Sequence, residues 1–374
     1  MATLLKPINE AETARFLLPR EAYFSGDWYR REMETLFAAN WYFAGFTRDV
    51  PEPGDYSCVQ VGAYPMFFLR DQNGDLRAFH NLCRHRGTAF LSGKGNVRHG
   101  MTCFYHFWTY NLDGGLRGFP QREQFPGADR DRLGLRPGAV ETFRGMVFVH
   151  VDPDAQGSLI EWMSDFPANF GPFDPEKYVE SPREPLKVAA NWKLFIENHI
   201  DGYHLFHLHK DSIHGLDHDN QEHSLYADHW TVHEPLFGPT LLPEYEKNMP
   251  VKVMFPDEPR WQASNVHMLF PNLGIATGAK WFVTVQSIPT GPTTSIVDSR
   301  MHYLPYEDGE EEQELTYYDK GSSEGTNLMA EDQLAAERLQ VAMQSPLFEC
   351  GPLARNYERP VMAFHESILR TLKP

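Results

Sequence analysis

The chain has 374 residues, of which 41% are hydrophobic, and this length is sufficient for two domains with cores of ordinary size. Its formal net charge of −17 at pH 7 argues against a nucleic acid partner, because an acidic protein and the phosphates would repel each other. Its four cysteines are too few for a disulfide framework. No stretch resembles a signal peptide or approaches the ~20 apolar residues of a membrane-spanning helix, so the sequence predicts a cytoplasmic protein without a membrane partner.

The N-terminal half of the chain predicts helical turns followed by a small all-β domain. Residues 11–45 alternate apolar and charged residues at helical spacing, so we expect residues 1–45 to form a helical lead-in that packs on the C-terminal domain. Short β-type runs then follow, and Asn73-Gly74 between the first two is typical of a hairpin turn. The runs are Met66–Leu69, Leu76–Phe79 and Gly145–Val151. They predict an all-β domain at residues 46–157.

Two short motifs inside this domain carry its chemistry. Cys83 and His85 form a C-x-H motif, and Cys103 and His106 form a C-x-x-H motif. Two thiolates with two imidazoles are the ligands of a Rieske [2Fe–2S] cluster, in which histidines replace two cysteines on one iron. The same residue types also bind zinc, but zinc-finger spacing pairs cysteine with cysteine and histidine with histidine. The motifs therefore predict a Rieske cluster and a role in electron transfer.

Residues 158–374 are predicted to form a larger α+β domain. Residues 158–185 are rich in proline and acidic side chains, which is typical of a linker. A helix-like segment follows at Trp192–His204. The remaining predicted elements are three strand-like runs and one helix, at Val266–Phe270, Trp281–Ile288, Ser295–Tyr303 and Asn327–Gln344. This order fits helices packed over an antiparallel sheet better than alternating βαβ units.

A histidine-rich run at Glu197–Lys210 offers a second metal site that could accept electrons from the cluster. His204 and His207 are three residues apart and share one face of a helix. His204 and His209 are five residues apart, so His209 joins His204 only where the helix ends or bulges before it. Helical spacing alone therefore favours His207 as the second histidine. Asn198 and the remaining histidines at 214, 218 and 223 are expected to be packing or surface residues.

These motifs resemble those of the oxygenase (α) component of Rieske non-haem iron oxygenases, multicomponent enzymes that hydroxylate aromatic rings or oxidatively demethylate amines and ethers. The resemblance extends over nearly the whole chain. Besides the two cluster motifs and the histidine run, it is carried by Trp41, Pro53-Gly54-Asp55-Tyr56, Leu112-Asp113-Gly114 and Asn191-Trp192-Lys193. Phe104 follows the second cysteine where many members have proline, and this departure removes no ligand.

The resemblance implies a mononuclear Fe(II) site. In the family pattern D-x-x-H-x₄-H, His204 and His209 would bind the iron, and a distant carboxylate would complete a 2-His-1-carboxylate site. The family places this carboxylate in an acidic pair on a C-terminal helix, which here is Glu331-Asp332. Asp332 falls on the same predicted apolar face as Leu328, Ala336, Leu339 and Met343. Because a carboxylate on an apolar face is costly unless it is paired or binds metal, we predict Asp332 as the ligand and keep Glu331 as the alternative.

Asp201 is predicted to have a different role. In the family its counterpart accepts hydrogen bonds from an iron-ligand histidine of its own chain and a cluster-ligand histidine of a neighbouring chain, here His204 and His106. It would therefore serve as an inter-subunit bridge for electron transfer. Some relatives that act on quaternary ammonium compounds carry glutamate at this position, whereas this chain carries aspartate.

The resemblance implies a terminal oxygenase that uses O₂, and electrons from a separate NAD(P)H-dependent flavin reductase, with or without a ferredoxin, to oxidise a small organic substrate. The chain lacks a G-x-G-x-x-G motif and an all-cysteine cluster motif, which agrees with a separate donor. Monooxygenation with oxidative dealkylation is favoured, and cis-dihydroxylation of an aromatic ring is the alternative. The chain length favours a homotrimer without β subunits. A Rieske electron carrier is a rival of another class, but it would need no second domain.

Overall fold

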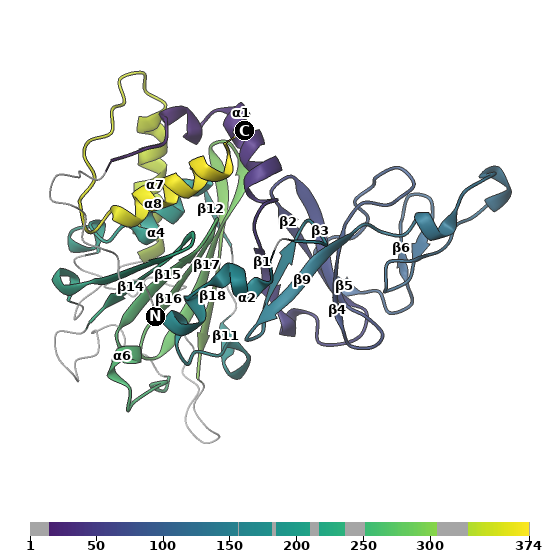
Figure 1. Ribbon diagram of the computed structural model, residues 1–374, viewed down its shortest axis with the longest axis horizontal. Coiled ribbons are helices and arrows are strands. Elements are labelled where there is room, and N and C mark those ends of the chain that lie inside the picture. The colour runs from purple at the N-terminus through teal and green to yellow at the C-terminus, as the bar shows by residue number, and fades with distance from the viewer. Residues whose placement is uncertain are drawn as a thin grey trace. The chain divides into compact units, whose positions relative to one another are not determined.

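The computed structural model describes residues 15–155, 157–181, 185–209, 217–235, 251–304 and 328–373. The chain forms two compact units, which we describe separately. The cluster unit is Arg30–Trp162, and the large unit is Met1–Tyr29 together with Met163–Pro374. Both contain antiparallel sheets and helices, so the predicted α+β class is confirmed (Figure 1). None of the helices among these residues is long and apolar enough to cross a membrane.

The cluster unit is built on antiparallel strands. Among the described residues, one sheet has the order β1-β10-β9-β4-β3-β2-β5, and a smaller sheet has the order β6-β7-β8. The larger sheet contains β1 Tyr42–Phe46, β2 Asp55–Val61, β3 Tyr64–Arg70, β4 Leu76–His80, β5 Lys94–Asn96, β9 Pro137–Phe143 and β10 Met146–His150. The smaller sheet contains β6 Met101–Thr102, β7 Thr109–Tyr110 and β8 Leu116–Gly118. The three strands predicted from periodicity appear as β3, β4 and β10.

Two of the sharpest turns depend on glycine. Gly74 lies in the predicted hairpin between β3 and β4 with φ +87°, a left-handed conformation that glycine adopts without strain. Gly62 lies between β2 and β3, and a Cβ there would approach the Met33 carbonyl oxygen to 2.3 Å. The β2–β3 turn therefore packs directly on the chain at Met33.

This packing places the unit boundary earlier than the predicted domain boundary at residues 45/46. The backbone N–H of Ala63 donates to the Met33 carbonyl at 2.9 Å, and the Tyr64 hydroxyl donates to the Glu34 carbonyl at 3.0 Å. Residues 30–45 thus belong to the cluster unit instead of forming a lead-in on the large unit. Helix α1, Gly26–Arg31, spans the point at which the two units divide.

The large unit contains an antiparallel sheet with the order β11-β18-β17-β16-β15-β14-β13, and β12 also pairs with β18. Its strands are β11 Val179–Ser181, β12 Leu186–Val188, β13 Glu222–Tyr226, β14 His229–Glu234, β15 Ser264–Leu269, β16 Leu273–Thr277, β17 Trp281–Gly291 and β18 Thr294–Tyr303. The strand-like runs predicted in this half of the chain correspond to β15, β17 and β18. Its helices are α3 Phe166–Phe170, α4 Trp192–Ile200, α6 Pro259–Gln262, α7 Leu328–Met343 and α8 Arg359–Thr371.

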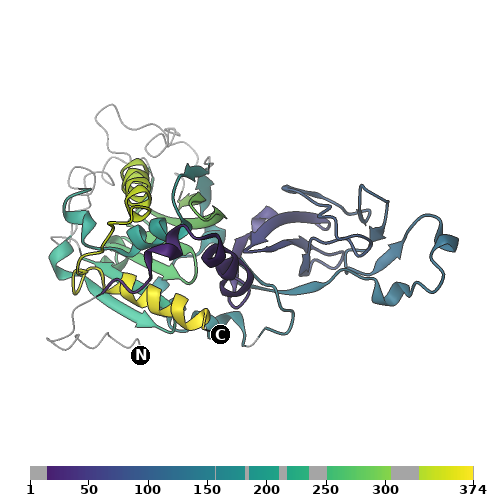
Figure 2. The same cartoon turned by 90° about the horizontal axis from the view of Figure 1, so that it is seen from above.

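The two faces of this sheet are covered by different helices. On one face, the ring of Phe282 packs edge-on against Phe170 of α3. On the other face, the Ser287 hydroxyl donates to the Trp192 carbonyl of α4 at 2.8 Å. Helix α4 contacts both α7 and α8, and Figure 2 shows these last two as separate helices, in yellow-green and yellow. Alternation along the strands therefore separates an α3 face from an α4 face.

The segment 158–185 is not the linker that its composition predicts. Helix α2, Leu159–Met163, ends where the large unit begins, and α3 and β11 follow. Phe166, Phe170 and Phe173 are completely buried. Proline is compatible with this structure because Pro167 and Pro175 lie in the first turn of their helices, where no intrahelical N–H is needed.

A buried polar cluster anchors α4. The Tyr23 hydroxyl donates to Glu197 Oε1 at 2.6 Å, and His365 Nε2 lies 3.0 Å from the same oxygen. The Leu17 N–H donates to His365 Nδ1, so the ring donates through Nε2. These bonds connect the N-terminal segment and α8 to the helix that leads into the histidine run.

Candidate metal centres

The two cluster motifs form matching loops in the cluster unit. In the first, the Cys83 N–H donates to the Thr88 carbonyl at 2.9 Å and the Gly87 N–H donates to the Cys83 carbonyl at 2.8 Å. In the second, the Cys103 N–H donates to the Trp108 carbonyl at 2.8 Å and the Phe107 N–H donates to the Cys103 carbonyl at 2.9 Å. The loops have the same closure although their Cys–His spacings differ. Their equivalent positions, Gly87 and Phe107, both have left-handed backbones, with φ +76° and +58°.

The four predicted cluster residues converge. Cys83 and Cys103 are buried, whereas His85 and His106 are half-buried, so the thiols lie inside and the imidazoles lie toward the surface. The two Nδ1 atoms are 3.2 Å apart, a separation from which two metal–imidazole bonds of about 2 Å can meet at one ion. Burial raises the pKa of the Cys83 thiol, and nearby Cys103 raises it further. A metal ion deprotonates a thiol that coordinates it. The donor set and its geometry fit a Rieske cluster.

Aromatic side chains hold these ligands. The Trp108 indole stacks on the His85 ring at 5.1 Å between centroids and 5° between planes, and it stacks on Phe119 on its other side. The Tyr110 hydroxyl accepts from the Arg84 N–H at 2.9 Å and lies 3.3 Å from Cys83 Sγ. The backbone donor fixes one lone pair of the hydroxyl, which leaves its hydrogen for the sulfur. No signal in the sequence distinguishes Tyr110, because a tyrosine in a strand usually indicates packing.

We predict that Tyr110→Phe lowers the reduction potential of the cluster by about 40 mV. A hydrogen bond to sulfur stabilises the more negative, reduced cluster, and a net bond of about 1 kcal/mol corresponds to this shift for one electron. The measurement is a redox titration followed by the visible spectrum, with Tyr105→Phe as the control. Tyr105 also lies in the second loop, but its hydroxyl accepts from Arg86 and no hydrogen bond from it to sulfur is found among the described residues. An unchanged potential in Tyr110→Phe would refute the sulfur contact.

The second candidate site lies in the large unit, where α4 ends. The predicted helix Trp192–His204 stops at Ile200, and Asp201 is already extended with φ −84° and ψ 108°. A short 3₁₀ helix, His204–Phe206, follows. Because the chain leaves the helix before the histidines, the helical spacing argument for His207 does not apply. His207 is exposed, whereas His209 is 2% exposed.

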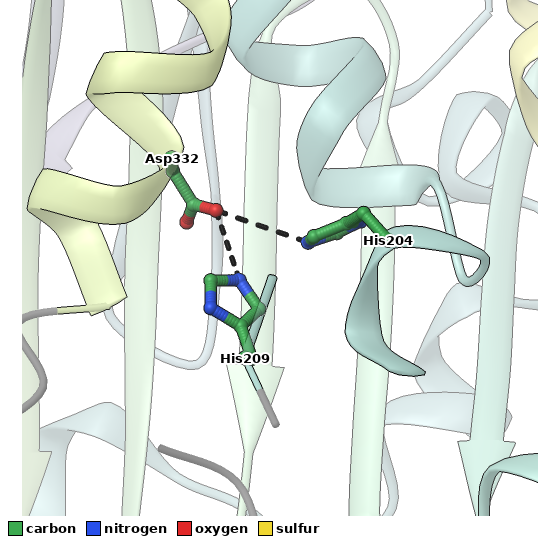
Figure 3. A group of neighbouring side chains, drawn as sticks. All are labelled: His204, His209 and Asp332. Carbon is green, nitrogen blue, oxygen red and sulfur yellow. Dashed lines mark ion pairs between the residues drawn. The ribbon is translucent and has the colours of Figure 1, made fainter. Parts of the chain in front are cut away.

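His204, His209 and Asp332 converge on one point (Figure 3). His209 Nε2 lies 2.9 Å from Asp332 Oδ1, and His204 Nε2 lies 3.8 Å from the same oxygen. The potential ligand atoms of the three residues all lie within 4.8 Å of one another. Two imidazoles and one carboxylate are the donor set of a 2-His-1-carboxylate iron site, so these residues fit a mononuclear iron.

A carboxylate faces the outer nitrogen of each imidazole. His204 Nδ1 is buried and lies 3.5 Å from Asp201 Oδ2, and His209 Nδ1 lies 2.7 Å from Glu331 Oε2. Burial lowers the pKa of His209, but hydrogen bonds and charge from Asp332 and Glu331 outweigh burial and leave this pKa raised. Both rings therefore point Nε2 toward Asp332 and Nδ1 toward another carboxylate.

Two further side chains at this site were not predicted. Asn198 Nδ2 donates to Asp332 Oδ1 at 2.7 Å, although the sequence suggested only packing. His199 packs on Gly274, where a Cβ would meet its Nε2 at 2.5 Å, and this nitrogen donates to the His267 carbonyl at 3.3 Å. Burial lowers the pKa of His199 to about 4, so the ring is neutral at pH 7. Their position just before Asp201 on α4 was the only signal in the sequence.

The helix that carries Asp332 matches its prediction in extent but not fully in its buried face. Helix α7 covers Leu328–Met343, and Ala336 and Met343 are buried as expected. Leu339 is 39% exposed, and Gln340 is buried in its place. The Gln340 side chain accepts from the Asn191 N–H at 2.7 Å and donates to the Tyr23 carbonyl at 3.1 Å. A polar residue with both ends bonded can therefore occupy a core position that periodicity assigns to leucine.

Residues 175–373 match the ring hydroxylating alpha subunit (catalytic domain) family, and residues 40–143 match the Rieske [2Fe-2S] domain. The chain belongs to the ring-hydroxylating alpha-subunit family. The resemblance inferred from the motifs is thus confirmed, as are the two cofactors of this family, a Rieske [2Fe–2S] cluster and a mononuclear iron.

Individual relatives of this chain differ in the reaction that their names give. The glycine betaine monooxygenase oxygenase subunit of Pseudomonas aeruginosa is 34% identical over 192 residues, which are 50% of this chain and 44% of that protein. The anthranilate 1,2-dioxygenase large subunit of Acinetobacter baylyi is 31% identical over 228 residues, which are 57% of this chain and 46% of that protein. These alignments span less than half of either relative. The solved structure of a quaternary ammonium Rieske monooxygenase has the same fold, with a TM-score of 0.78, 20% identity and 100% of each chain covered.

Proposed function

We propose that this chain is the terminal oxygenase component of a multicomponent Rieske non-haem iron oxygenase. It would oxidise a small organic substrate with O₂ and with electrons from a separate flavin reductase, directly or through a ferredoxin. The observation that carries the proposal is the convergence of His204, His209 and Asp332 in a chain that also carries the Rieske loops. An electron carrier would need only the loops.

In this proposal each candidate site has its own ligands. Cys83, His85, Cys103 and His106 would hold the cluster, and His204, His209 and Asp332 would hold the iron. When bound, the mononuclear iron supplies O₂ activation beside the substrate. The protein's part is to orient the ligands, and Asn198 does so by donating to Asp332.

The sheet offers an apolar surface for the substrate. On the α4 face, the same face as Gly274, Val266 pairs with Ala276 and Ala276 pairs with Val283. Val266 and Ala276 are half-buried, and His199 of α4 packs on Gly274, two residues before Ala276 on β16. Apolar side chains at these positions exclude water and favour a substrate with an alkyl or aryl group at the reacting carbon.

Monooxygenation that leads to oxidative N- or O-dealkylation is the favoured reaction, because the betaine relative is named a monooxygenase. Cis-dihydroxylation of an aromatic ring is the alternative, because the anthranilate relative is named a dioxygenase. The same ligand set serves both reactions. The substrate we favour is therefore a small N-alkylated compound, followed by an aromatic acid.

We propose a homotrimer, without β subunits, in which the cluster loops dock beside Asp201 of a second copy. The second loop exposes Phe104, Tyr105 and Phe107, with 68% of Phe104 accessible, so the loop presents an apolar surface that a partner would cover. Residues 84–136 contain nine lysines and arginines against four acidic residues in a chain of net charge −17. This basic region needs an acidic partner.

The surroundings of Asp201 are aromatic and acidic, which complements the aromatic and basic surroundings of the second cluster loop. Tyr203 is exposed and stacks with Tyr357 at 6.3 Å between centroids. Burial raises the pKa of Tyr357, and the charges of Asp219 and Asp217 raise it further, so both carboxylates lie close to this ring. An aromatic surface with acidic neighbours would therefore meet an aromatic surface with basic ones. Sedimentation equilibrium should give three times the chain mass, and a monomer at micromolar concentration would contradict this assembly.

Metal and sulfide analysis tests the function class. Protein purified without oxygen should contain three irons and two sulfides per chain. Two irons with two sulfides would indicate an electron carrier, and one zinc without sulfide would exclude a Rieske cluster.

Product analysis tests the reaction. The reduced protein is supplied with ¹⁸O₂ and, separately, with glycine betaine, choline, an N-methylaniline or anthranilate. Release of formaldehyde, with one labelled oxygen entering the substrate carbon, is expected for dealkylation. A cis-diol with two labelled oxygens would select the alternative.

A further inference from the structure

Helix α7 places two successive carboxylates on the two nitrogens of one imidazole. Glu331 Oε2 lies 2.7 Å from His209 Nδ1, and Asp332 Oδ1 lies 2.9 Å from His209 Nε2. We propose that Glu331 is a positioning residue that fixes the tautomer and the orientation of His209 toward the metal. The proposal rests on the ligand set of the proposed function and adds a residue that is not one of the three ligands.

The chemistry of the ring requires such a partner. A neutral imidazole carries one N–H, and only the other nitrogen can bind a metal. A carboxylate at Nδ1 accepts that N–H and is an acceptor only, so it favours the tautomer in which Nε2 keeps its lone pair. Nε2 is the nitrogen that faces Asp332 and His204 in Figure 3. Glu331 therefore directs the lone pair of His209 into the metal site.

Local structure makes His209 dependent on this contact. His204 lies in a 3₁₀ helix that follows the end of α4, whereas His209 lies beyond it in irregular chain. Its side chain is 2% exposed, so in the intact protein the partner of Nδ1 is Glu331 and not bulk water. The Glu331 side chain is 27% exposed, and a 16-residue helix that packs on α4 holds its backbone. Helix α7, through Glu331, thus orients His209 in the irregular segment.

His204 offers an internal comparison. Its Nδ1 lies 3.5 Å from Asp201 Oδ2, too far for the short charge-assisted bond that Glu331 makes with His209. In addition, Asp201 Oδ1 accepts a hydrogen bond from the Tyr203 N–H at 2.6 Å. Among the described residues, His209 is therefore the iron-site histidine with the stronger carboxylate partner.

The test measures metal binding and does not depend on turnover. Three variants are compared with the wild type: Glu331→Ala, Glu331→Gln and Glu337→Ala. Glu337 is the matched control, because it lies on α7 and accepts from the Ala189 N–H and from Gln333. In the part of the chain that the structure describes, no hydrogen bond or ion pair joins it to His204, His209 or Asp332. The cluster is left intact, the mononuclear iron is removed, and Co²⁺ is titrated back while its absorption spectrum and the proton NMR spectrum are recorded.

We expect Glu331→Ala to weaken Co²⁺ binding about 10- to 100-fold, the usual effect of losing a partner of a ligating histidine. The exchangeable Nδ1–H resonance of His209, shifted by the paramagnetic ion, should disappear, because water then exchanges it. Glu331→Gln keeps an acceptor oxygen and should retain the resonance, with affinity between those of wild type and Glu331→Ala. Glu337→Ala should match the wild type in both measurements.

Three outcomes would overturn the proposal, and they differ in what they say about the metal site. If Glu331→Ala binds Co²⁺ as tightly as the wild type and keeps the resonance, Glu331 has no positioning role although the metal site stands. If the wild type binds no metal outside the cluster, the proposed ligand set fails and the role of Glu331 fails with it. A loss of affinity in Glu337→Ala equal to that in Glu331→Ala would show that any change in α7 has the same effect, which also refutes the proposal.

Discussion

Replacing Asp332 with alanine is expected to remove the mononuclear iron and all turnover while the visible spectrum of the Rieske cluster stays intact. Asp332 Oδ1 lies 2.9 Å from His209 Nε2 and 3.8 Å from His204 Nε2, and it supplies the single carboxylate of the proposed site. Without it, two imidazoles remain, which is too few ligands for a stable site. The loss of iron affinity should exceed the roughly 100-fold that the loss of an outer partner can cost.

The measurement is iron content by elemental analysis together with the visible spectrum and product formation. The wild type should contain three irons per chain and Asp332→Ala two, and His204→Ala should behave like Asp332→Ala because it removes another ligand of the same site. Glu337→Ala on the same helix is the control and should retain three irons. Retained iron in Asp332→Ala would move the ligand role to Glu331, whose carboxylate reaches the other side of His209.

Six of the strands, three in each unit, could be predicted because their signals are local. Runs rich in aromatic and other apolar residues mark β3 and β17, and Asn73-Gly74 marks the hairpin between β3 and β4. The division of the chain was harder to predict. Residues 30–45 have helical spacing, but the backbone contact between Met33 and Ala63 assigns them to the cluster unit. A contact between backbone atoms leaves no trace in side-chain patterning.

The candidate metal residues were predictable from spacing only with the help of the family pattern. Periodicity extended α4 through His204 and would have paired His204 with His207, whereas the helix ends at Ile200. Gly202 follows directly after Asp201 and is the one signal of this end, but the apolar periodicity continues past it, and the helix ends because Asp201 is already extended. Once the chain has left the helix, spacing no longer predicts which residues share a face.

Residues that orient the ligands carry the weakest signals in the sequence. Asn198 and Tyr110 belong to types that are common in helices and strands, and only their contacts with Asp332 and Cys83 distinguish them. The sequence offers Glu331 as the alternative to Asp332 for the metal ligand, but in the structure Glu331 faces Nδ1 of His209. A helix presents successive residues about 100° apart, so an acidic pair can serve two atoms of one ring.

Asp201→Asn is expected to slow electron transfer to the mononuclear site about 10- to 100-fold while all three irons are retained. Asp201 Oδ1 accepts from the Tyr203 N–H at 2.6 Å, and Oδ2 lies 3.5 Å from His204 Nδ1 and would accept from His106 of the partner subunit. An asparagine has one acceptor oxygen and one NH₂ group. If its oxygen accepts from the Tyr203 N–H, its NH₂ group faces the imidazole N–H groups. Because both sides are then donors, no hydrogen bond can form. The bridge would thus be lost without a change in size.

The experiment is rapid mixing of the reduced protein with O₂ and substrate, with reoxidation of the cluster followed optically. Asp174→Asn is the matched control, because Asp174 Oδ1 likewise accepts the N–H two residues ahead, that of Glu176 at 3.2 Å. Among the residues that the structure describes, no hydrogen bond or ion pair joins Asp174 to a candidate ligand of either site. The control should reoxidise at the wild-type rate, which separates the bridge from an ordinary turn. Wild-type reoxidation in Asp201→Asn, with iron fully retained, would show that the negative charge between the two histidines is not part of the electron path, and another contact of the docked loops would have to be sought.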